Sequence, residues 1–563
     1  MGPTDDRRPT ADRPTGPASV SVPTHRGGPG RALPSARASV PSAMRHGVRV
    51  LCLVVCGLWS VALCPAYAQA TPEAGTLDPL ADLVATEDGR ALFHAAHAAL
   101  IDWRLDAAEA DFTRLGAMEP GSPAGAYGLS KVALWRTLVM ERPPFPQRFF
   151  SLNDSLDDVL GAAPRGTWRI HLEGEREMHR AMVFMRQERF TKAARAFHAA
   201  CGRFKATTRD ADVPFAESYL GRGVCLVAAG AIPSEYKWIG ALLGFRGTVQ
   251  DGIETLERSI TEADIAVPEA VLFLALADAA LNERQADGLG RLGALAEAHP
   301  ESALVQYLYG TLLLEERDAP RAERHLRAAA DLVAQDGVAP LPFVDHHLGL
   351  ALFRQDRFEA AADHLERYLR EAPGRALVAQ AGLHAGLARE LLGDRRAAER
   401  HYRRVRATRD NDSDQQAERE AERRLAGAMT EAERAVLLGA AAYDGGRYAE
   451  AIPRLQPALG AQDADPTLRA EAAYRTGRAY QALDDDREAL RHYRLAMSLQ
   501  DDPLAKWGPW AIYHIGEVHE AAGDHEAARE AYEQALENEA EFDYHKSMEQ
   551  RTKAALERLE RAG

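Results

Sequence analysis

The stretch from residue 511 to 540 constrains the fold most, because it contains two helical patterns separated by one short break. Apolar and small residues recur at intervals of three and four on both sides of Gly523 and Asp524, two residues that interrupt helices. Two helices joined by so short a turn lie antiparallel to each other. The stretch therefore predicts a helical hairpin.

The same pattern recurs upstream at nearly constant intervals. Gly477 stands 39 residues before Gly516, and Gly439 stands 38 residues before Gly477. Earlier copies centre on Gly386, Gly349 and Gly310. Repeats of this length stack so that each unit buries the apolar face of its neighbour. We predict about eleven hairpins from Leu80 to the C-terminal end.

Fixed spacings within one repeat identify the type of hairpin. Gly516 is followed by Ala528, Tyr532 and Ala535. These four residues resemble the tetratricopeptide repeat, with its small residue at position 8, alanine at 20, aromatic at 24 and alanine at 27. The resemblance implies an all-α, right-handed α-solenoid of stacked helical hairpins with a C-terminal capping helix. It also implies binding of other proteins, without indicating which ones.

The repeat pattern divides the chain into segments of different regularity. We expect degenerate N-terminal helical repeats at 80–261 with an insertion at 232–247, tetratricopeptide-like repeats at 268–406, a charged insertion at 407–429, further such repeats at 430–541 and a capping helix at 542–563. Within the charged insertion, 410–414 is rich in Asp and Asn but lacks the Gly and closing Glu of a calcium-binding loop. A solvated turn and helix cap is therefore favoured there, and Thr430 with Glu433 predicts a capping box after it.

The N-terminal end has the composition of an exported protein. Residues 1–43 are rich in Pro, Arg, Gly and Ser, so we expect them to be disordered and favour Met44 as the start of translation. Residues 44–68 combine a short basic segment, an apolar run and a small-x-small site, which is typical of a secretory signal peptide. A linker at 69–79 follows. We expect export to the bacterial periplasm; the alternative is a signal that is retained as an anchor.

Two cysteines, Cys201 and Cys225, remain after removal of the signal. An exported pair suggests a disulfide. However, Cys201 is expected near the end of one helix and Cys225 about 16 Å along the next antiparallel helix, at 1.5 Å per residue. Bridged Cα atoms must lie within about 7 Å, so we predict two buried free thiols.

The insertion at 232–247 contains Trp238, Leu242 and Phe245. Together with the C-terminal end it is similar to the eukaryotic inclusion-body-clearance group of helical-repeat proteins, which implies only binding. We expect these apolar side chains to fold back onto the solenoid. The alternative is contact with a membrane or a partner.

The sequence contains no pattern that indicates catalysis or a cofactor. His94 with His97, and Asp345 with His346 and His347, could each offer ligand atoms, but a zinc site needs three or four ligands and no complementary cluster is evident. We interpret these histidines as helix-surface residues and expect no metal, no cofactor and no small-molecule substrate. The net charge of −15 also argues against nucleic acid as a partner, because phosphate binding needs clustered Lys and Arg.

The first helices of successive hairpins line the binding groove in the tetratricopeptide family, with positions 2, 5, 9 and 12 facing the ligand. The residues carried over in this way, with two tyrosines added to the row, are Tyr307, Phe343, His346, Phe353, Tyr443, Tyr474, Arg478, Gln481, Trp510, Tyr513 and Glu517. An aromatic row with scattered polar groups suits an extended or helical peptide. The alternative is that these rings only pack neighbouring helices together.

These observations favour a non-enzymatic interaction scaffold of the bacterial cell envelope that binds peptides or proteins in the groove. One alternative is a membrane-associated assembly factor that uses the Trp238 insertion. Another is a subunit of an envelope enzyme complex, whose site would be built from residues distant in sequence.

Expression of the full sequence in a bacterial host tests the export prediction. The basic, apolar and small-residue order of 44–68 predicts cleavage after Ala68 or nearby, with the mature chain in the periplasm. N-terminal sequencing of the periplasmic fraction measures this directly. Recovery of a mature chain that starts at Met1 in the cytosol would contradict it.

Overall fold

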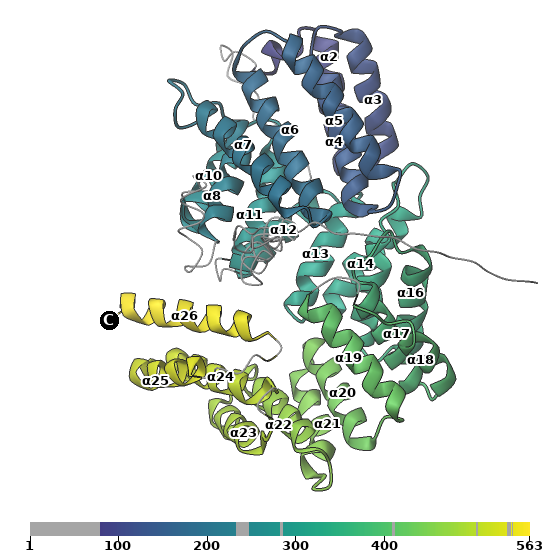
Figure 1. Ribbon diagram of the computed structural model, residues 1–563, viewed down its shortest axis with the longest axis vertical. Helices are drawn as coiled ribbons and strands as arrows, with labels where there is room; N and C mark the ends of the chain where they lie inside the picture. The colour runs from purple at the N-terminus through teal and green to yellow at the C-terminus, as the bar shows by residue number, and fades with distance from the viewer. Residues whose placement is uncertain are drawn as a thin grey trace, which may run out of the picture. The chain divides into compact units, whose positions relative to one another are not determined.

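A computed structural model describes residues 79–231, 247–281, 285–407, 411–502, 505–537, 542 and 544–562. All of them belong to the second of two units into which the chain divides, Ala43–Gly563. Every regular element in these ranges is a helix (Figure 1). The residues 1–43, the signal segment 44–68, nearly all of the linker and the side chains of Trp238, Leu242 and Phe245 lie outside the described residues.

Consecutive helices pair into hairpins along the described chain. The pairs are α2 (Glu87–Ile101) with α3 (Leu105–Met118), α4 (Ala124–Val139) with α5 (Phe145–Ala162), α6 (Thr167–Arg186) with α7 (Phe190–Thr207), α8 (Ser218–Gly230) with α10 (Val249–Glu262), α11 (Val267–Leu281) with α12 (Gln285–Ala298), α13 (Ala303–Glu315) with α14 (Ala319–Val333), α15 (Phe343–Phe353) with α16 (Phe358–Glu371), α17 (Val378–Leu391) with α18 (Arg395–Tyr402), α20 (Glu431–Asp444) with α21 (Tyr448–Gly460), α22 (Pro466–Gln481) with α23 (Asp486–Leu499), and α24 (Trp507–Ala521) with α25 (His525–Leu536). A 3-10 helix, η2 (Pro79–Asp82), precedes them, α19 (Asp412–Ala426) interrupts them and α26 (His545–Ala562) follows them. The predicted all-α class, the stacked hairpins and their number are confirmed.

Each regular hairpin is closed by a large side chain that lies on the small residue of its first helix. A Cβ atom on Gly516 would lie 2.5 Å from the Tyr532 ring, and one on Gly477 would lie 2.7 Å from the Tyr493 ring. Both tyrosines are fully buried. Since close-packed interiors leave no room for such an overlap, glycine at this position lets the aromatic ring of the return helix fill the hairpin.

The hydroxyl groups of these buried tyrosines are paired within the same hairpin. Tyr402 donates to Glu390 and Tyr532 donates to Glu520, each at 2.7 Å. Tyr493 donates in the same way to Gln481, twelve residues earlier in the chain. Because a buried hydroxyl without a partner is costly, an acceptor one turn after the glycine completes the motif.

The turns of the hairpins have the predicted geometry. Gly523 ends its helix in the left-handed region at φ +78, a conformation that costs glycine least. Asp524 then caps α25, because its carboxylate accepts a hydrogen bond from the backbone N–H of Ala527 at 3.2 Å. The break that was predicted at these two residues is confirmed.

The charged insertion forms α19, which packs on α17 and α18. The side chain of Asn411 caps it by accepting the backbone N–H of Asp414 at 2.8 Å. The predicted helix cap is therefore present at 411, while residue 410 lies outside the described residues. The capping box of Thr430 and Glu433 at the start of α20 is confirmed as well.

The last helix, α26, covers the end of the repeat array. Met548, Ala555 and Leu559 are buried on one of its faces and pack in one hydrophobic cluster with residues of α24 and α25. Arg558 on another face donates to Glu520 of α24 at 2.9 Å. This confirms the predicted capping helix. None of the helices in the described ranges has the length and apolar character needed to cross a bilayer.

The prediction of free thiols is wrong, since Cys201 and Cys225 form a disulfide with their Cα atoms 5.8 Å apart. The error lies in the placement of Cys201. Helix α7 continues to Thr207, so Cys201 lies six residues before its end, while Cys225 lies seven residues after the start of α8 at Ser218. The two cysteines are therefore nearly equidistant from the turn, and their side chains meet across the pair of helices.

Reduction of this disulfide should destabilise the N-terminal repeats by about 3 kcal/mol, because the bond closes a loop across a sequence separation of 24 residues in the unfolded chain. Thermal unfolding with and without reductant measures the effect. The double variant Cys201→Ser, Cys225→Ser is the control, since its unfolding should not respond to reductant. Two titratable thiols in the oxidised chain without residues 1–68, where Cys201 and Cys225 are the only cysteines, would contradict the bond.

Candidate functional site

The structure places the eleven predicted groove residues in two classes of exposure. Tyr307, His346, Phe353, Tyr443 and Tyr513 are buried. Phe343, Tyr474, Arg478, Gln481, Trp510 and Glu517 are partly exposed. The first class packs helices together, as the alternative interpretation expected for the whole row, and the second class is available in part to a ligand.

Two of these residues contact their own hairpin. Gln481 accepts the hydroxyl of Tyr493, as described above. Phe353, at the equivalent position of its repeat, is 4% exposed and packs against Phe358 at 5.3 Å between ring centroids. Position 12 of these repeats therefore faces the return helix.

Five of the predicted residues come together on α22 and α24 around His514. We call them, with His514 and Tyr493, the His514 cluster: Tyr474, Arg478, Tyr493, Trp510, Tyr513, His514 and Glu517. The Trp510 ring stacks on the His514 ring at 5.8 Å and 28°, and the Tyr493 ring stacks on it at 5.9 Å and 25°. The rings of Tyr474 and Tyr513 also contact the imidazole, at 5.7 and 5.1 Å.

Polar contacts hold the imidazole of His514 in a single orientation. Its Nδ1 lies 2.6 Å from the Glu517 carboxylate, and its Nε2 lies 3.1 Å from the Tyr474 hydroxyl. The Arg478 guanidinium reaches both ring nitrogens, at 2.7 and 2.5 Å. A neutral ring that donates from Nδ1 to Glu517 and accepts at Nε2 from Tyr474 and Arg478 fits these partners, and the contact of Arg478 with Nδ1 is then not a hydrogen bond.

The electrostatics of the cluster favour that neutral ring. Burial, together with the charge of Arg478, lowers the pKa of His514 to about 4. Burial acts against ionisation of Glu517, but His514 and Arg478 outweigh it and lower the pKa of this carboxyl to about 2. Near neutral pH the cluster therefore holds the ion pair of Arg478 and Glu517, whose side chains are 20% and 32% exposed, around an uncharged histidine.

Cationic side chains surround the exposed rings next to the cluster. Arg475 and Lys506 lie 5.2 and 4.8 Å from the centroid of the Trp507 ring. Arg551 of α26 lies 6.0 Å from the Trp510 ring. Contacts of this kind hold indole rings in place while their remaining surface stays available.

Sequence reasoning missed His514, although the repeat register carries a signal for it. Tyr474 is at position 5 of its repeat and bonds to His514 at position 6 of the next one. Tyr307 and His347 have the same positions in an earlier pair of repeats, and the Tyr307 hydroxyl lies 3.3 Å from Nδ1 of His347. Comparison of repeats in register would have found both histidines.

The interpretation of the histidines as surface residues is correct only for some. His94 is exposed, but His97 and His346 are 7% and 2% exposed. Both lie on the first helix of a hairpin, and in a stacked array such a helix is covered by its own return helix and by the neighbouring hairpin. No metal-binding group of three in the described residues includes them.

A second group of polar side chains is buried among the first helices of the N-terminal repeats. Lys131 of α4 pairs with Glu269 of α11 at 2.5 Å and donates to Tyr127 at 3.3 Å. Tyr127 in turn donates to Glu175 of α6 at 3.4 Å, and His179 lies 3.3 Å from the same carboxylate. We call these five residues the Lys131 network. All are less than 9% exposed, so the network joins helices and offers no open surface.

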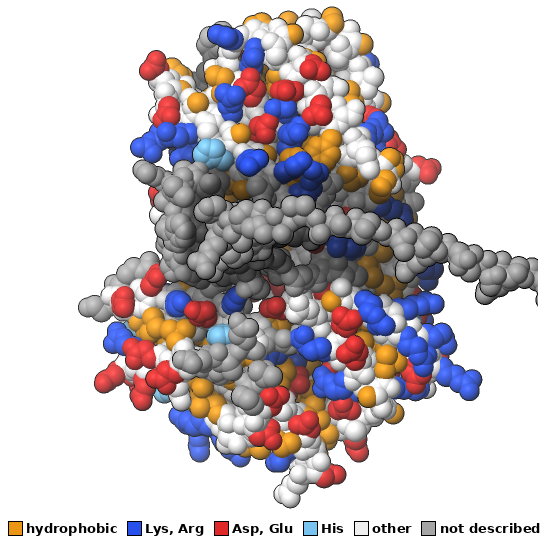
Figure 2. All heavy atoms as spheres, viewed as in Figure 1, with side chains coloured by type: hydrophobic (Ala, Val, Ile, Leu, Met, Phe, Trp, Pro, Cys, Tyr) orange, Lys and Arg blue, Asp and Glu red, His pale blue; other side chains and the backbone are white. Residues whose placement is uncertain are grey.

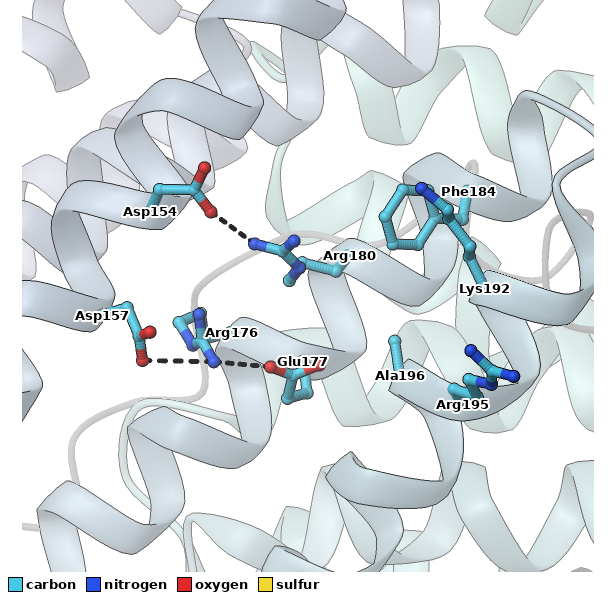
Figure 3. A pocket seen from close by; sticks show the side chains of 9 residues that line it. All are labelled: Asp154, Asp157, Arg176, Glu177, Arg180, Phe184, Lys192, Arg195 and Ala196. Atoms are coloured by element: carbon cyan, nitrogen blue, oxygen red, sulfur yellow. Dashed lines mark hydrogen bonds and ion pairs between the residues drawn. The ribbon is translucent and has the colours of Figure 1, made fainter.

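An open surface pocket of about 480 Å³ lies over α5, α6 and α7 (Figure 3). Two of its three guanidinium groups are paired with carboxylates: Arg180 pairs with Asp154 at 2.6 Å, and Arg176 pairs with Asp157 at 3.2 Å. Phe184 and Ala196 are its apolar lining residues. Small-molecule sites are mostly apolar with few polar groups, so this pocket is a weaker candidate than the His514 cluster.

Comparisons of the sequence with known families and proteins match its repeats over a small part of the chain. Residues 511–542 match the tetratricopeptide repeat. Photosystem I assembly protein Ycf3 of Synechococcus elongatus is 40% identical over 66 residues, which are 12% of this chain, and the match spans only 37% of that relative's length. Among solved structures, yeast Tom70 aligns with 77% of this chain and 96% of its own at 13% identity and a TM-score of 0.29. The tetratricopeptide domain of P58(IPK) aligns with 84% and 99% at 12% identity and a TM-score of 0.20. Scores of this size say nothing about how the repeats of this chain are arranged.

The lowered pKa of His514 predicts acid lability. A histidine with a folded pKa of about 4 and an unfolded pKa near 6.5 stabilises the fold fully above pH 6.5, and this stability is lost as the pH falls toward 4. Between pH 7 and pH 5, His514 alone should account for a loss of about 2 kcal/mol. Glu517 contributes little in this range, because its pKa is near 2 in the folded state and about 4.3 in the unfolded chain.

Urea unfolding followed by tryptophan fluorescence at pH 7 and pH 5 measures this difference. His514→Gln should reduce the pH dependence, and His525→Gln, at an exposed position of α25, should leave it unchanged. Equal pH dependence in the wild type and in His514→Gln would contradict the assignment.

Proposed function

We propose that this chain, a tetratricopeptide repeat protein, is a non-enzymatic scaffold of the bacterial cell envelope that binds a peptide segment of a partner protein at the His514 cluster. Tetratricopeptide repeat proteins are in general protein interaction scaffolds. The observation that carries the proposal is the group of partly exposed side chains of Tyr474, Arg478, Trp510 and Glu517, all held around one buried histidine.

The arrangement suits a ligand with apolar or aromatic anchors. Rings fixed by stacking lose little conformational entropy on binding, and such residues dominate binding energy at interfaces. Figure 2 shows hydrophobic side chains interspersed with charged ones where Figure 1 places α24 to α26. Arg551, beside Trp510, adds a cation that a carboxylate of the peptide can contact. We therefore infer a peptide that combines apolar anchors with acidic side chains.

The contacts of His514 favour binding over acid–base catalysis. A histidine held by a carboxylate resembles the base of a catalytic dyad, but a base needs a nitrogen that is free to take the substrate proton. Here Tyr474 and Arg478 occupy Nε2, and Glu517 occupies Nδ1. The histidine is also only 3% exposed.

Two features support a location in the envelope. Residues 44–68 have the order of a secretory signal. Cys201 and Cys225 are placed for a disulfide, a bond that persists in oxidising compartments such as the periplasm.

A role as an assembly factor is the second candidate, because the matched relative is by its name an assembly protein. In that case the partner peptide belongs to a subunit of a complex, and contact with a membrane would involve the insertion that contains Trp238. A subunit role in an envelope enzyme complex would use the same surface. Liposome flotation with and without residues 232–247 separates the membrane role from the scaffold role.

Alanine substitutions separate ligand contact from packing at the site. Trp510→Ala should leave thermal unfolding nearly unchanged and weaken a captured partner by about 1 to 2 kcal/mol, because the ring is partly exposed. Tyr513→Ala should instead lose roughly 3 kcal/mol of stability, because this ring is 5% exposed and packs on Tyr532. Affinity capture from envelope extracts, then calorimetry with the captured partner's peptide, measures both effects.

Leu495→Ala on α23 is the matched control, since this side chain is 38% exposed and lies outside the cluster. Arg551→Ala and Arg529→Ala form a second pair, in which only the former should weaken an acidic peptide. Partner capture that does not change in Trp510→Ala and Arg551→Ala would exclude the His514 cluster as the binding site.

A further inference from the structure

Three side chains with metal-binding atoms meet where the end of α2 contacts the turn between α12 and α13. Asp102 directly follows α2, and His299 and Glu301 lie in that turn. One ligand atom from each, a ring nitrogen of His299 and one oxygen of each carboxylate, lie within 4.8 Å of one another. Donor atoms around one zinc ion with bonds of 2.0 to 2.1 Å lie about 3.3 Å apart, so small side-chain rotations bring the three onto a single ion.

The imidazole of His299 has an unsatisfied group in this cluster. The residue is 5% exposed, and its Nε2 is buried with no hydrogen-bond partner among the described residues. A buried ring nitrogen without a partner loses its hydration without compensation. A metal ion is one of the few ligands that satisfies such a nitrogen and a carboxylate together.

Asp102 and Glu301 place two like charges close together, with one carboxylate oxygen of each within 4.8 Å of the other. Asp102 caps the C-terminal end of α2, where the helix dipole is negative and disfavours a carboxylate. A divalent cation between the two carboxylates would offset both their mutual repulsion and the unfavourable helix dipole.

The backbone around the cluster is held in place before any ion binds. The Ser302 hydroxyl donates to the carbonyl of Ile101 at 2.8 Å, which fixes the turn against the end of α2. The Gln306 amide donates to the carbonyls of Ala296 and His299, at 2.9 and 3.3 Å. Because both sides are fixed, little ordering is required on binding.

We propose that Asp102, His299 and Glu301 form a site for a divalent transition-metal ion, with zinc as the best fit. One imidazole and two carboxylates are donors that zinc accepts, and three protein ligands leave a fourth position for water or for a side chain of a partner. The ion ties the first hairpin to the turn before α13, across about 200 residues of sequence. This site is independent of the His514 cluster.

Zinc titration of the untagged full-length protein, stripped with chelator and followed by calorimetry and thermal unfolding, tests the proposal. We expect one zinc ion per chain at micromolar affinity or tighter and a higher melting temperature in its presence. Asp102→Asn, His299→Gln and Glu301→Gln should each weaken zinc binding at least tenfold. Glu297→Gln, an exposed carboxylate at the end of α12, is the matched control and should bind zinc as the wild type does.

Because Glu301 is exposed, Glu301→Gln should fold even if the variants of Asp102 and His299 unfold, and it then tests the proposal by itself. Unfolding curves in chelator show which variants fold. Absence of saturable zinc binding, unchanged affinity in Glu301→Gln and His299→Gln, or tighter binding of calcium than of zinc would overturn the assignment.

Discussion

The contact between a glycine of the first helix and a large side chain of the return helix determines the geometry of each regular hairpin. In three repeats the large residue is a tyrosine whose hydroxyl finds an acceptor twelve residues earlier, as in Tyr532 with Glu520. One side chain thus fills the space over the glycine and pairs its polar end inside the same repeat. Since each hairpin is closed by its own residues, successive hairpins have a similar distance between their two helices and can stack regularly. The first helices of neighbouring repeats then come into contact along one surface.

The sequence predicts the repeats well because their signal is local. Glycine, alanine and aromatic residues at fixed spacings select one packing of two adjacent helices. The hairpins, and their turns at residues such as Gly523, could therefore be predicted from the sequence. The disulfide could not be predicted in the same way. Its formation depends on the end of α7, and a shift of that end by one or two turns moves Cys201 by up to about 10 Å relative to Cys225. Helix ends are decided by tertiary contacts, which spacing alone does not specify.

The candidate site was predicted in part. The positions carried over from the repeat family selected Tyr474, Arg478, Trp510 and Glu517, which the structure brings together. They also selected Gln481 as a groove residue, whereas in the structure its side chain accepts the hydroxyl of Tyr493. It also omitted His514, because a residue that is 3% exposed at the centre of a cluster has no amphipathic signature of its own. Contacts between consecutive repeats, such as Tyr474 with His514, span 40 residues and become visible only when repeats are aligned with one another.

The two halves of the repeat array use buried polar groups differently. In the N-terminal half Gly128, Gly174 and Gly221 face phenylalanine rings. The Lys131 network there joins α4, α6 and α11 with charges that are nearly inaccessible to water. Loss of one partner there would leave a buried charge uncompensated, so these helices resist any repacking that a ligand would require. The polar groups of the His514 cluster reach solvent in part, since Arg478 and Glu517 keep 20% and 32% of their side chains exposed. A ligand can cover these exposed groups without breaking the ion pair, which supports the proposed binding of a partner at the C-terminal repeats.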